Sequence, residues 1–225
     1  MQPLLLIYCY DAYCGWCYGF SPVISKIAIT FSDRLSTDVL SGGMILPEKP
    51  VHIGATAGYI LNAYKTVEET TGVTFGADYL WHIQNPDDSD WRPHSEKPAI
   101  AMCIFKELYP DRAIEFSADL QYALHFEGRD LTDDEAYQHL LEKYSIQPEL
   151  FYSKLSSDEY KEMAHYEFSL MKQLQVTGYP TVFIQTGPLK FNMVARGFTD
   201  YENLKDRIEK VLEEYESAQQ ISDEF

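Results

Sequence analysis

The sequence predicts a mixed α/β fold in which a long helical section separates two groups of strands. Residues 3–10 form a nearly continuous apolar run of strand length, and residues 14–31 then carry apolar side chains at helical spacing. After a short strand at 36–40, β-branched and aromatic residues return at 181–195, where they predict a hairpin. A last amphipathic helix follows, and the chain shows no internal repeat or flexible linker.

Local signals justify the N-terminal elements. The run at 3–10 is typical of a strand buried on both faces, and it is too short to cross a bilayer. Pro22 is expected to interrupt the following helix early and to bend it. The strand at 36–40 ends in Ser41-Gly42-Gly43, which predicts a turn.

The middle of the chain is predicted to be mainly helical. Residues 70–90 are expected to form a loop, and the segment Asn85–Trp91 (NPDDSDW) within and beside it is strongly turn-forming. Thr132 is expected to cap a helix whose Glu135 closes a capping box. The other expected helices cover about 52–65, a run opened by Pro98, 114–124, a short helix from 148 and about 157–175.

This order predicts two domains. Residues 1–50 and 170–225 are expected to form one discontinuous α/β domain, and residues 51–169 a helical insertion domain. The last helix is expected to be capped by Thr199 or Asp200. A length of 225 residues with 45% hydrophobic residues supports a packed core.

The charge of the chain restricts its partners. The formal net charge is −17, which disfavours nucleic acid and anionic membranes as partners because both require a basic face. The N-terminus lacks the basic region and cleavage site of a secretory signal, so we expect the reducing cytoplasm as the compartment. In that compartment a CxxC pair favours catalysis or metal binding over a structural disulfide.

The motif Cys14-Gly15-Trp16-Cys17 lies where a strand is predicted to end and a helix to begin. A helix N-terminus favours a thiolate over a thiol through its partial positive charge and free N–H groups. A thiolate is the species that attacks disulfides. The placement therefore predicts a redox dithiol.

Zinc is the alternative for this motif. Zinc sites need a second pair of ligands, and the six histidines include no pair at the required spacing. A site from Cys9, Cys14, Cys17 and one histidine is the remaining option, and we expect no metal. Cys9 and Cys103 are isolated and are expected to be small buried apolar residues.

Four segments carry a resemblance to known proteins: Asp11–Phe20 (DAYCGWCYGF), Ser41–Met44 (SGGM), Phe126–Thr132 (FEGRDLT) and Val176–Phe183 (VTGYPTVF). In this order they resemble the thioredoxin superfamily, and within it the DsbA family, in particular the FrnE-like proteins without a signal peptide. The resemblance spans nearly the whole chain.

The resemblance implies a thioredoxin-like fold with a large helical insertion between the second strand and a strand that begins after a cis proline. It implies that Cys14 attacks, that Cys17 resolves, and that Pro180 lies beside both. The Tyr179 backbone would then pair with an extended substrate, as an added strand does. The candidate catalytic residues are Cys14, Cys17 and Pro180, and the candidate substrate-binding residues are Trp16, Tyr179 and Thr181.

Two positions depart from the relatives. They commonly carry a buried acid six residues before the first cysteine, and this chain has Tyr8 there. Asp11 is the nearest acid in the sequence, followed by Ala12 where relatives often have proline.

Three functions follow from these observations. The first is a thiol–disulfide oxidoreductase acting on protein or small-molecule thiols and disulfides, with no cofactor and with glutathione as a candidate co-substrate. The second is an enzyme similar to kappa-type glutathione transferases and 2-hydroxychromene-2-carboxylate isomerases. The third is a non-catalytic redox-sensing adaptor. The aromatic residues Tyr79, Trp81 and Trp91 either line a substrate groove or pack in the interior. Redox direction and oligomeric state stay open.

Overall fold

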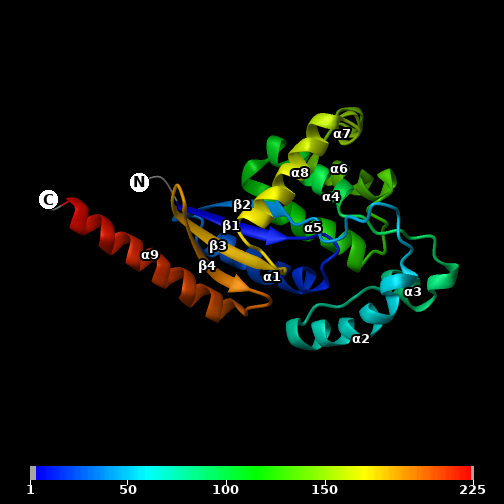
Figure 1. Ribbon diagram of the computed structural model, residues 1–225, viewed down its shortest axis with the longest axis horizontal. Coiled ribbons are helices and arrows are strands. Elements are labelled where there is room, and N and C mark those ends of the chain that lie inside the picture. The colour runs from blue at the N-terminus through cyan, green and yellow to red at the C-terminus, as the bar shows by residue number, and fades with distance from the viewer. Residues whose placement is uncertain (1–3, 224–225) are drawn as a thin grey trace.

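The centre of the molecule is a mixed β-sheet (Figure 1), seen in a computed structural model that describes residues 4–223. Within these residues four strands form one sheet in the order β2-β1-β3-β4. They are β1 (Leu4–Tyr10), β2 (Leu35–Ser41), β3 (Thr181–Gly187) and β4 (Lys190–Arg196). β1 runs parallel to β2 and antiparallel to β3, and β3 and β4 form the expected hairpin. Pro3, the first residue of the predicted strand, lies outside the described residues.

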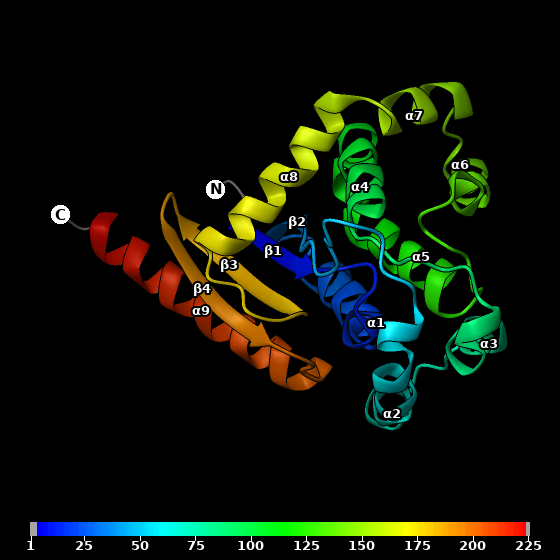
Figure 2. The same ribbon diagram turned by 45° about the vertical axis from the view of Figure 1, so that its right-hand side comes forward.

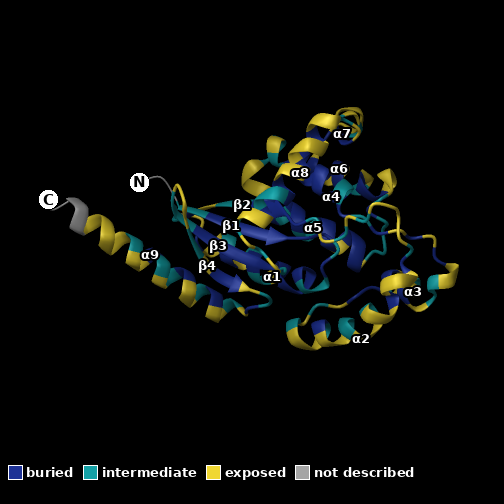
Figure 3. Ribbon diagram, viewed as in Figure 1, coloured by how far each residue is buried: buried dark blue, intermediate teal, exposed yellow. Residues whose placement is uncertain are grey.

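Helices cover both faces of the sheet (Figure 2). α1 (Gly15–Thr30) and α9 (Tyr201–Asp223) pack on the face that presents Leu6 and Tyr8. The end of α8 (Asp158–Gln173) packs on the other face, where Met171 meets Cys9, Leu40 and Phe183. β1 is therefore largely buried (Figure 3), as its apolar run predicts, whereas the outer strand β4 is mostly exposed or half-buried.

The section between β2 and β3 is helical, which confirms the predicted fold class. Its α-helices before α8 are α2 (Gly54–Thr71), α3 (Ala77–Gln84), α4 (Glu96–Leu108), α5 (Ala113–His125), α6 (Gln138–Tyr144) and α7 (Pro148–Leu155). Short 3₁₀ helices are η1 (Pro86–Asp88), η2 (Pro110–Arg112) and η3 (Asp134–Tyr137). α5 packs on α1 and β2, and α4 packs on α8. The division into two domains stays a prediction.

None of the helices within residues 4–223 is both long enough and apolar enough to span a membrane.

Pro22 does not interrupt α1, contrary to the expectation. A proline removes the N–H that would bond the carbonyl four residues earlier, here that of Tyr18. The Ser21 hydroxyl donates to that same carbonyl at 2.8 Å, so the carbonyl remains satisfied. α1 therefore continues as a single helix from Gly15 to Thr30.

Two other expectations are wrong. Residues 70–90 are not a plain loop: α2 extends to Thr71, Gly72 ends it in the left-handed region with φ 78°, and α3 follows. Thr132 does not cap a helix, because Asp130 Oδ1 accepts both the Thr132 N–H and its hydroxyl at 2.8 Å. For the last helix the capping residue is Asp200, whose Oδ1 accepts the Asn203 N–H at 3.0 Å.

A partly buried ion cluster fastens α4 and α8 to β2. The Lys106 ammonium lies 2.7 Å from Asp38 Oδ1 and 2.8 Å from Glu167 Oε1. It also donates to the Val39 carbonyl at 2.8 Å. Glu167 Oε2 accepts the Ser41 N–H at 2.8 Å, so both of its oxygens are engaged. Side chains of α4 (Lys106) and α8 (Glu167) therefore attach these helices to β2.

Candidate active site

Cys14 is the N-cap residue of α1, directly after the turn that follows β1. Its N–H donates to the Asp11 carbonyl at 3.1 Å, which closes that turn. The Cys17 N–H donates to Cys14 Sγ at 3.2 Å. A negative charge on Cys14 Sγ therefore meets an N–H donor and the positive end of the helix dipole.

The segment before β3 reaches Cys14 from 165 residues away. β1 and β3 are paired with Cys9 opposite Thr181, so the start of β3 lies next to the end of β1. The Tyr179–Pro180 peptide bond is cis, the geometry that the resemblance implies. The Cys14 thiol points at the Tyr179 carbonyl at 3.7 Å. The sheet therefore brings Cys14, Cys17 and Pro180 together.

The two thiols differ in their surroundings. Both are free, Cys14 with 6% of its surface exposed and Cys17 with none. Burial, followed by the neighbouring Cys14, raises the pKa of Cys17 well above its usual value. Only Cys14 combines access from outside with donors for its sulfur. This difference favours Cys14 as the attacking thiol and Cys17 as the resolving one.

The three candidate substrate-binding residues lie around Cys14 but differ in exposure. Trp16 is half-buried, with its ring 6.4 Å from that of Phe198. Tyr179 is half-buried beside Cys14. Thr181 is buried, and its hydroxyl donates to the Gly178 carbonyl at 2.8 Å. Thr181 therefore holds the loop before β3, and its side chain does not reach the surface.

The aromatic residues of the insertion belong mostly to the interior. Tyr79 and Trp91 are buried with their rings 6.1 Å apart, whereas Trp81 is half exposed. Packing is thus the correct interpretation for Tyr79 and Trp91. Cys9 and Cys103 are buried as predicted, and burial raises the pKa of Cys9 to about 12.

Gly42 leaves room for the Tyr179 ring at the edge of the site. The Tyr179 hydroxyl donates to the Gly42 carbonyl at 2.9 Å, and a Cβ atom on Gly42 would overlap the ring. The close approach that a glycine permits is therefore made by the protein's own tyrosine. This contact ties the loop after β2 to the segment before β3.

Gly42→Ala should displace the Tyr179 ring and lower both stability and activity. We expect a loss of about 1–3 kcal/mol in the free energy of unfolding, from overpacking and a broken hydrogen bond. Urea denaturation and disulfide-reduction rates measure the two effects. Gly178→Ala is the matched control, because a Cβ there meets open space. Equal behaviour of the two variants would show that the Gly42 contact is unimportant.

Sequence reasoning missed the role of Asp11. Its carboxylate is buried and accepts hydrogen bonds from Tyr13 N at 3.0 Å, Met44 N at 2.7 Å and Ser95 Oγ at 3.0 Å. Ser95 in turn accepts the Ile45 N–H with its hydroxyl at 3.0 Å. Asp11 thus joins the dithiol turn, the loop after β2 and the start of α4. Burial raises the pKa of Asp11, and these donors partly offset the effect.

His125 was also missed, because nothing near it in the sequence marks it. It is buried behind the dithiol turn, with its ring 5.1 Å from the rings of Tyr18 and Tyr79 and 5.4 Å from that of Phe75. Neither ring nitrogen makes a regular hydrogen bond to any of residues 4–223. Burial lowers the pKa of His125 to about 3, so the ring is neutral at physiological pH.

Acid should destabilise the protein through His125. Between its usual pKa of 6.5 and the folded value of about 3, only the unfolded state binds the proton. The free energy of unfolding should therefore fall by about 1.4 kcal/mol for each pH unit in that window from this group alone. Urea denaturation at several pH values should show a correspondingly smaller slope for His125→Gln. An unchanged slope in His125→Gln would refute the effect.

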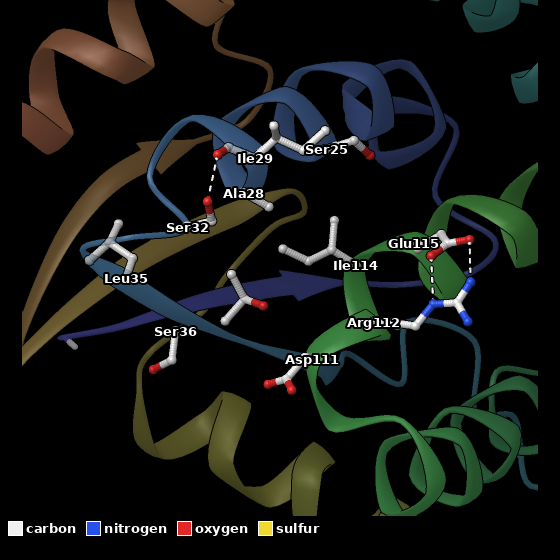
Figure 4. A pocket seen from close by; sticks show the side chains of 11 residues that line it. Ser25, Ala28, Ile29, Ser32, Leu35, Ser36, Asp111, Arg112, Ile114 and Glu115 are labelled. Atoms are coloured by element: carbon white, nitrogen blue, oxygen red, sulfur yellow. Dashed lines mark hydrogen bonds and ion pairs between the residues drawn. The ribbon is translucent and has the colours of Figure 1, made fainter. Parts of the chain in front are cut away.

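A cavity of about 690 Å³ lies at the end of α1 that is opposite to Cys14 (Figure 4). Its lining includes Ile29, Ser36 and Arg112, and Arg112 forms a two-point ion pair with Glu115 at 2.9 and 3.0 Å. Ile29 belongs to the last turn of α1 and Cys14 to the opposite end, so the cavity is not part of the dithiol site. Across the described part of the chain, His, Cys, Asp and Glu side chains nowhere form a group of three that could hold a metal ion.

Comparison with solved structures gives matches along nearly the whole chain. A protein from Nitrosomonas europaea assigned as a protein disulfide isomerase is 22% identical, with a TM-score of 0.83 over 95% of this chain and 99% of the other. The cytosolic disulfide reductase DsbM from Pseudomonas aeruginosa is 22% identical, with a TM-score of 0.75 over 93% and 99%. A 2-hydroxychromene-2-carboxylate isomerase is 14% identical, with a TM-score of 0.60 over 98% and 99%. At these identities the likeness establishes the fold.

Comparison with known sequences covers less of the chain than comparison with solved structures does. No curated protein sequence matches the chain. The family model of the DSBA-like thioredoxin domain matches residues 87–209, which is more than half of the chain and includes Pro180 but not the two cysteines of the motif. With the β-sheet, the helical insertion and the cis proline described above, the match shows that the chain belongs to the family of DSBA-like thioredoxin domains.

Proposed function

We propose that the chain is a thiol–disulfide oxidoreductase with Cys14 and Cys17 as its redox pair. The Cys14 thiolate attacks one sulfur of a substrate disulfide, forms a mixed disulfide and releases the other sulfur as a thiolate. The Cys17 thiolate then attacks Cys14 Sγ, and the second substrate sulfur leaves. The substrate gains two electrons and two protons, which the dithiol loses, and the reverse sequence oxidises a substrate.

The observation that carries this proposal is the environment of Cys14 Sγ. It accepts the Cys17 N–H at 3.2 Å, lies at the start of α1, and faces the Tyr179 carbonyl at 3.7 Å. A thiolate there is stabilised at one side and borders a backbone segment at the other. We propose that an extended substrate pairs with that segment at Tyr179 and contacts Trp16. Thr181 supports the segment through its hydrogen bond to the Gly178 carbonyl.

We propose thiols and disulfides of proteins and small molecules as substrates, with glutathione as the small-molecule candidate. DsbM, whose fold this chain shares, has also been solved with glutathione, at 23% identity and a TM-score of 0.73 over 93% of this chain and 100% of the other. A reducing cytoplasm as the compartment supplies glutathione in reduced form and is part of the same proposal.

Two measurements test the proposal. The reduced protein should reduce insulin disulfides catalytically when glutathione is supplied, and a Cys17→Ser variant should accumulate mixed disulfides through Cys14. The reduction potential of the dithiol, measured against a glutathione buffer, then gives the favoured direction. A protein that neither turns over insulin nor forms mixed disulfides would be an adaptor and not an oxidoreductase.

The shared fold with a 2-hydroxychromene-2-carboxylate isomerase supports a second candidate. That function predicts glutathione-dependent conversion of a small substrate that does not need Cys17. Turnover of the hydroxychromene by Cys17→Ser, without insulin reduction by the unmodified protein, would favour it.

A further inference from the structure

Tyr8 lies under the dithiol, on the β1 face that packs against α1. It is fully buried between Val39 of β2 and Val182 of β3, to which it is paired across the sheet. Its ring lies 5.8 Å from that of Phe20 and 5.6 Å from that of Tyr10, so packing fixes its direction. The phenol is therefore held rigidly at the base of the site.

The Tyr8 hydroxyl is buried and lacks a regular hydrogen-bond partner among residues 4–223. It nevertheless lies within reach of the Cys17 thiol. A buried hydroxyl without a partner costs free energy, so such a group calls for an explanation. The group beside it, Cys17 Sγ, is the atom that must become negative during the reaction.

We propose, on the basis of the function proposed above, that Tyr8 donates a hydrogen bond to the Cys17 thiolate as that thiolate forms, and is thus a catalytic residue of the resolving step. The position is one that a carboxylic acid could occupy, and the two groups act differently. A carboxylate can accept the Cys17 proton, but once both are ionised it repels the thiolate. A phenol stays neutral and stabilises the thiolate without accepting its proton.

The surroundings keep the phenol in its donor form. Burial, and then the charges of Cys17 and Cys14, raise the pKa of Tyr8 well above its usual value, so the hydroxyl keeps its proton when Cys17 is ionised. The titratable groups around the pair include Cys14, Tyr10, Asp11 and Tyr179. The Asp11 backbone also bonds to Cys17, while the Asp11 carboxylate is engaged by Tyr13, Met44 and Ser95. Tyr8 therefore adds a side-chain donor to the backbone contact that Cys17 already has.

The reaction remains balanced with this role. Cys17 gives up its proton and attacks Cys14 Sγ in the mixed disulfide, forming the Cys14–Cys17 bond and breaking the bond to the substrate sulfur. That sulfur leaves as a thiolate and takes up one proton, so no proton is gained or lost in this step. Tyr8 exchanges no proton and no electron, and its hydrogen bond to Cys17 forms as charge builds on that sulfur.

A chromogenic aromatic disulfide tests the proposal in the full chain, because each displaced aromatic thiolate gives an absorbance signal. The first phase reports attack by Cys14 and the second reports resolution by Cys17. In Tyr8→Phe the second phase should slow by about tenfold or more, the range expected for losing a hydrogen bond to a charged group. Its pH midpoint should also rise, while the first phase stays within about twofold of the unmodified protein.

Tyr10→Phe is the matched control, since it removes a hydroxyl from the same face of β1 at equal burial. A fluorinated tyrosine at position 8 serves if Tyr8→Phe fails to fold. Its more acidic hydroxyl should move the second-phase midpoint to lower pH.

An unaltered second phase in Tyr8→Phe, equal slowing in Tyr8→Phe and Tyr10→Phe, or no midpoint shift with fluorotyrosine would overturn the role of Tyr8. Absence of both phases in the unmodified protein would instead refute the proposed function.

Discussion

Cys14→Ser should reduce insulin no faster than the added reductant does alone, a loss of at least about a hundredfold in catalysed rate. A serine hydroxyl at the start of α1 can still accept the Cys17 N–H, so the fold should be retained. It cannot attack a disulfide, because it is not ionised at neutral pH. Insulin turbidity and quenched-flow trapping of mixed disulfides measure the loss.

Cys103→Ala provides the control for this variant, since it removes a buried thiol that lies on α4 away from the dithiol. It should keep its activity within about twofold, as substitutions outside the reacting groups commonly do. Full activity in Cys14→Ser would disprove the mechanism, and equal losses in the two variants would indicate that activity depends on folding and not on the reactive thiol.

Asp11→Ala should destabilise the protein by about 3 kcal/mol or more, because each hydrogen bond to a charged group contributes about 1.5–3 kcal/mol. The substitution leaves Tyr13 N, Met44 N and the Ser95 hydroxyl without their acceptor. The insulin-reduction rate should fall as well, since the turn before Cys14 loses its attachment to the loop after β2. Urea denaturation and insulin reduction measure the two losses.

Asp11→Asn separates shape from charge, because it keeps one oxygen but presents an amide donor to groups that also donate. Its free energy of unfolding should lie between that of Asp11→Ala and that of the unmodified protein. Asp88→Asn, at an exposed aspartate, should leave the free energy of unfolding within about 0.5 kcal/mol. A loss below about 1 kcal/mol in Asp11→Ala would show that the buried contacts of Asp11 contribute little.

The dithiol could be placed from the sequence because its signals are local. A strand, a short break and a helix start all fall within residues 4–30, and the structure has β1 and α1 there with Cys14 between them. Pro180 could be placed beside the dithiol only through the family resemblance, since no local pattern links it to Cys14.

The contacts of Asp11 could not be predicted, because its partners are distant along the chain. Met44 lies 33 residues away and Ser95 84 residues away, in segments that meet Asp11 only when the fold is complete. His125 was missed for a related reason: its shifted pKa comes from burial against aromatic rings, which no local pattern reveals.

The errors in the helical section have two causes, and the first is that turn-forming residues near α3 were given too much weight. α3 forms among residues that favour turns because Tyr79 and Ile83 are buried, and this packing outweighs local preference. At Thr132 the neighbouring Asp130 binds the hydroxyl that the capping box required.

The ion cluster beneath β2 has a consequence for association between chains. β2 and β4 are the outer strands, and an open outer strand is a template on which other extended chains can assemble. The Lys106 ammonium donates a hydrogen bond to the Val39 carbonyl, so this carbonyl on the edge strand β2 already has a partner. An incoming strand would have to displace this cation from two carboxylates. An unfolded polypeptide therefore gains little by adding to β2, which disfavours aggregation along that strand.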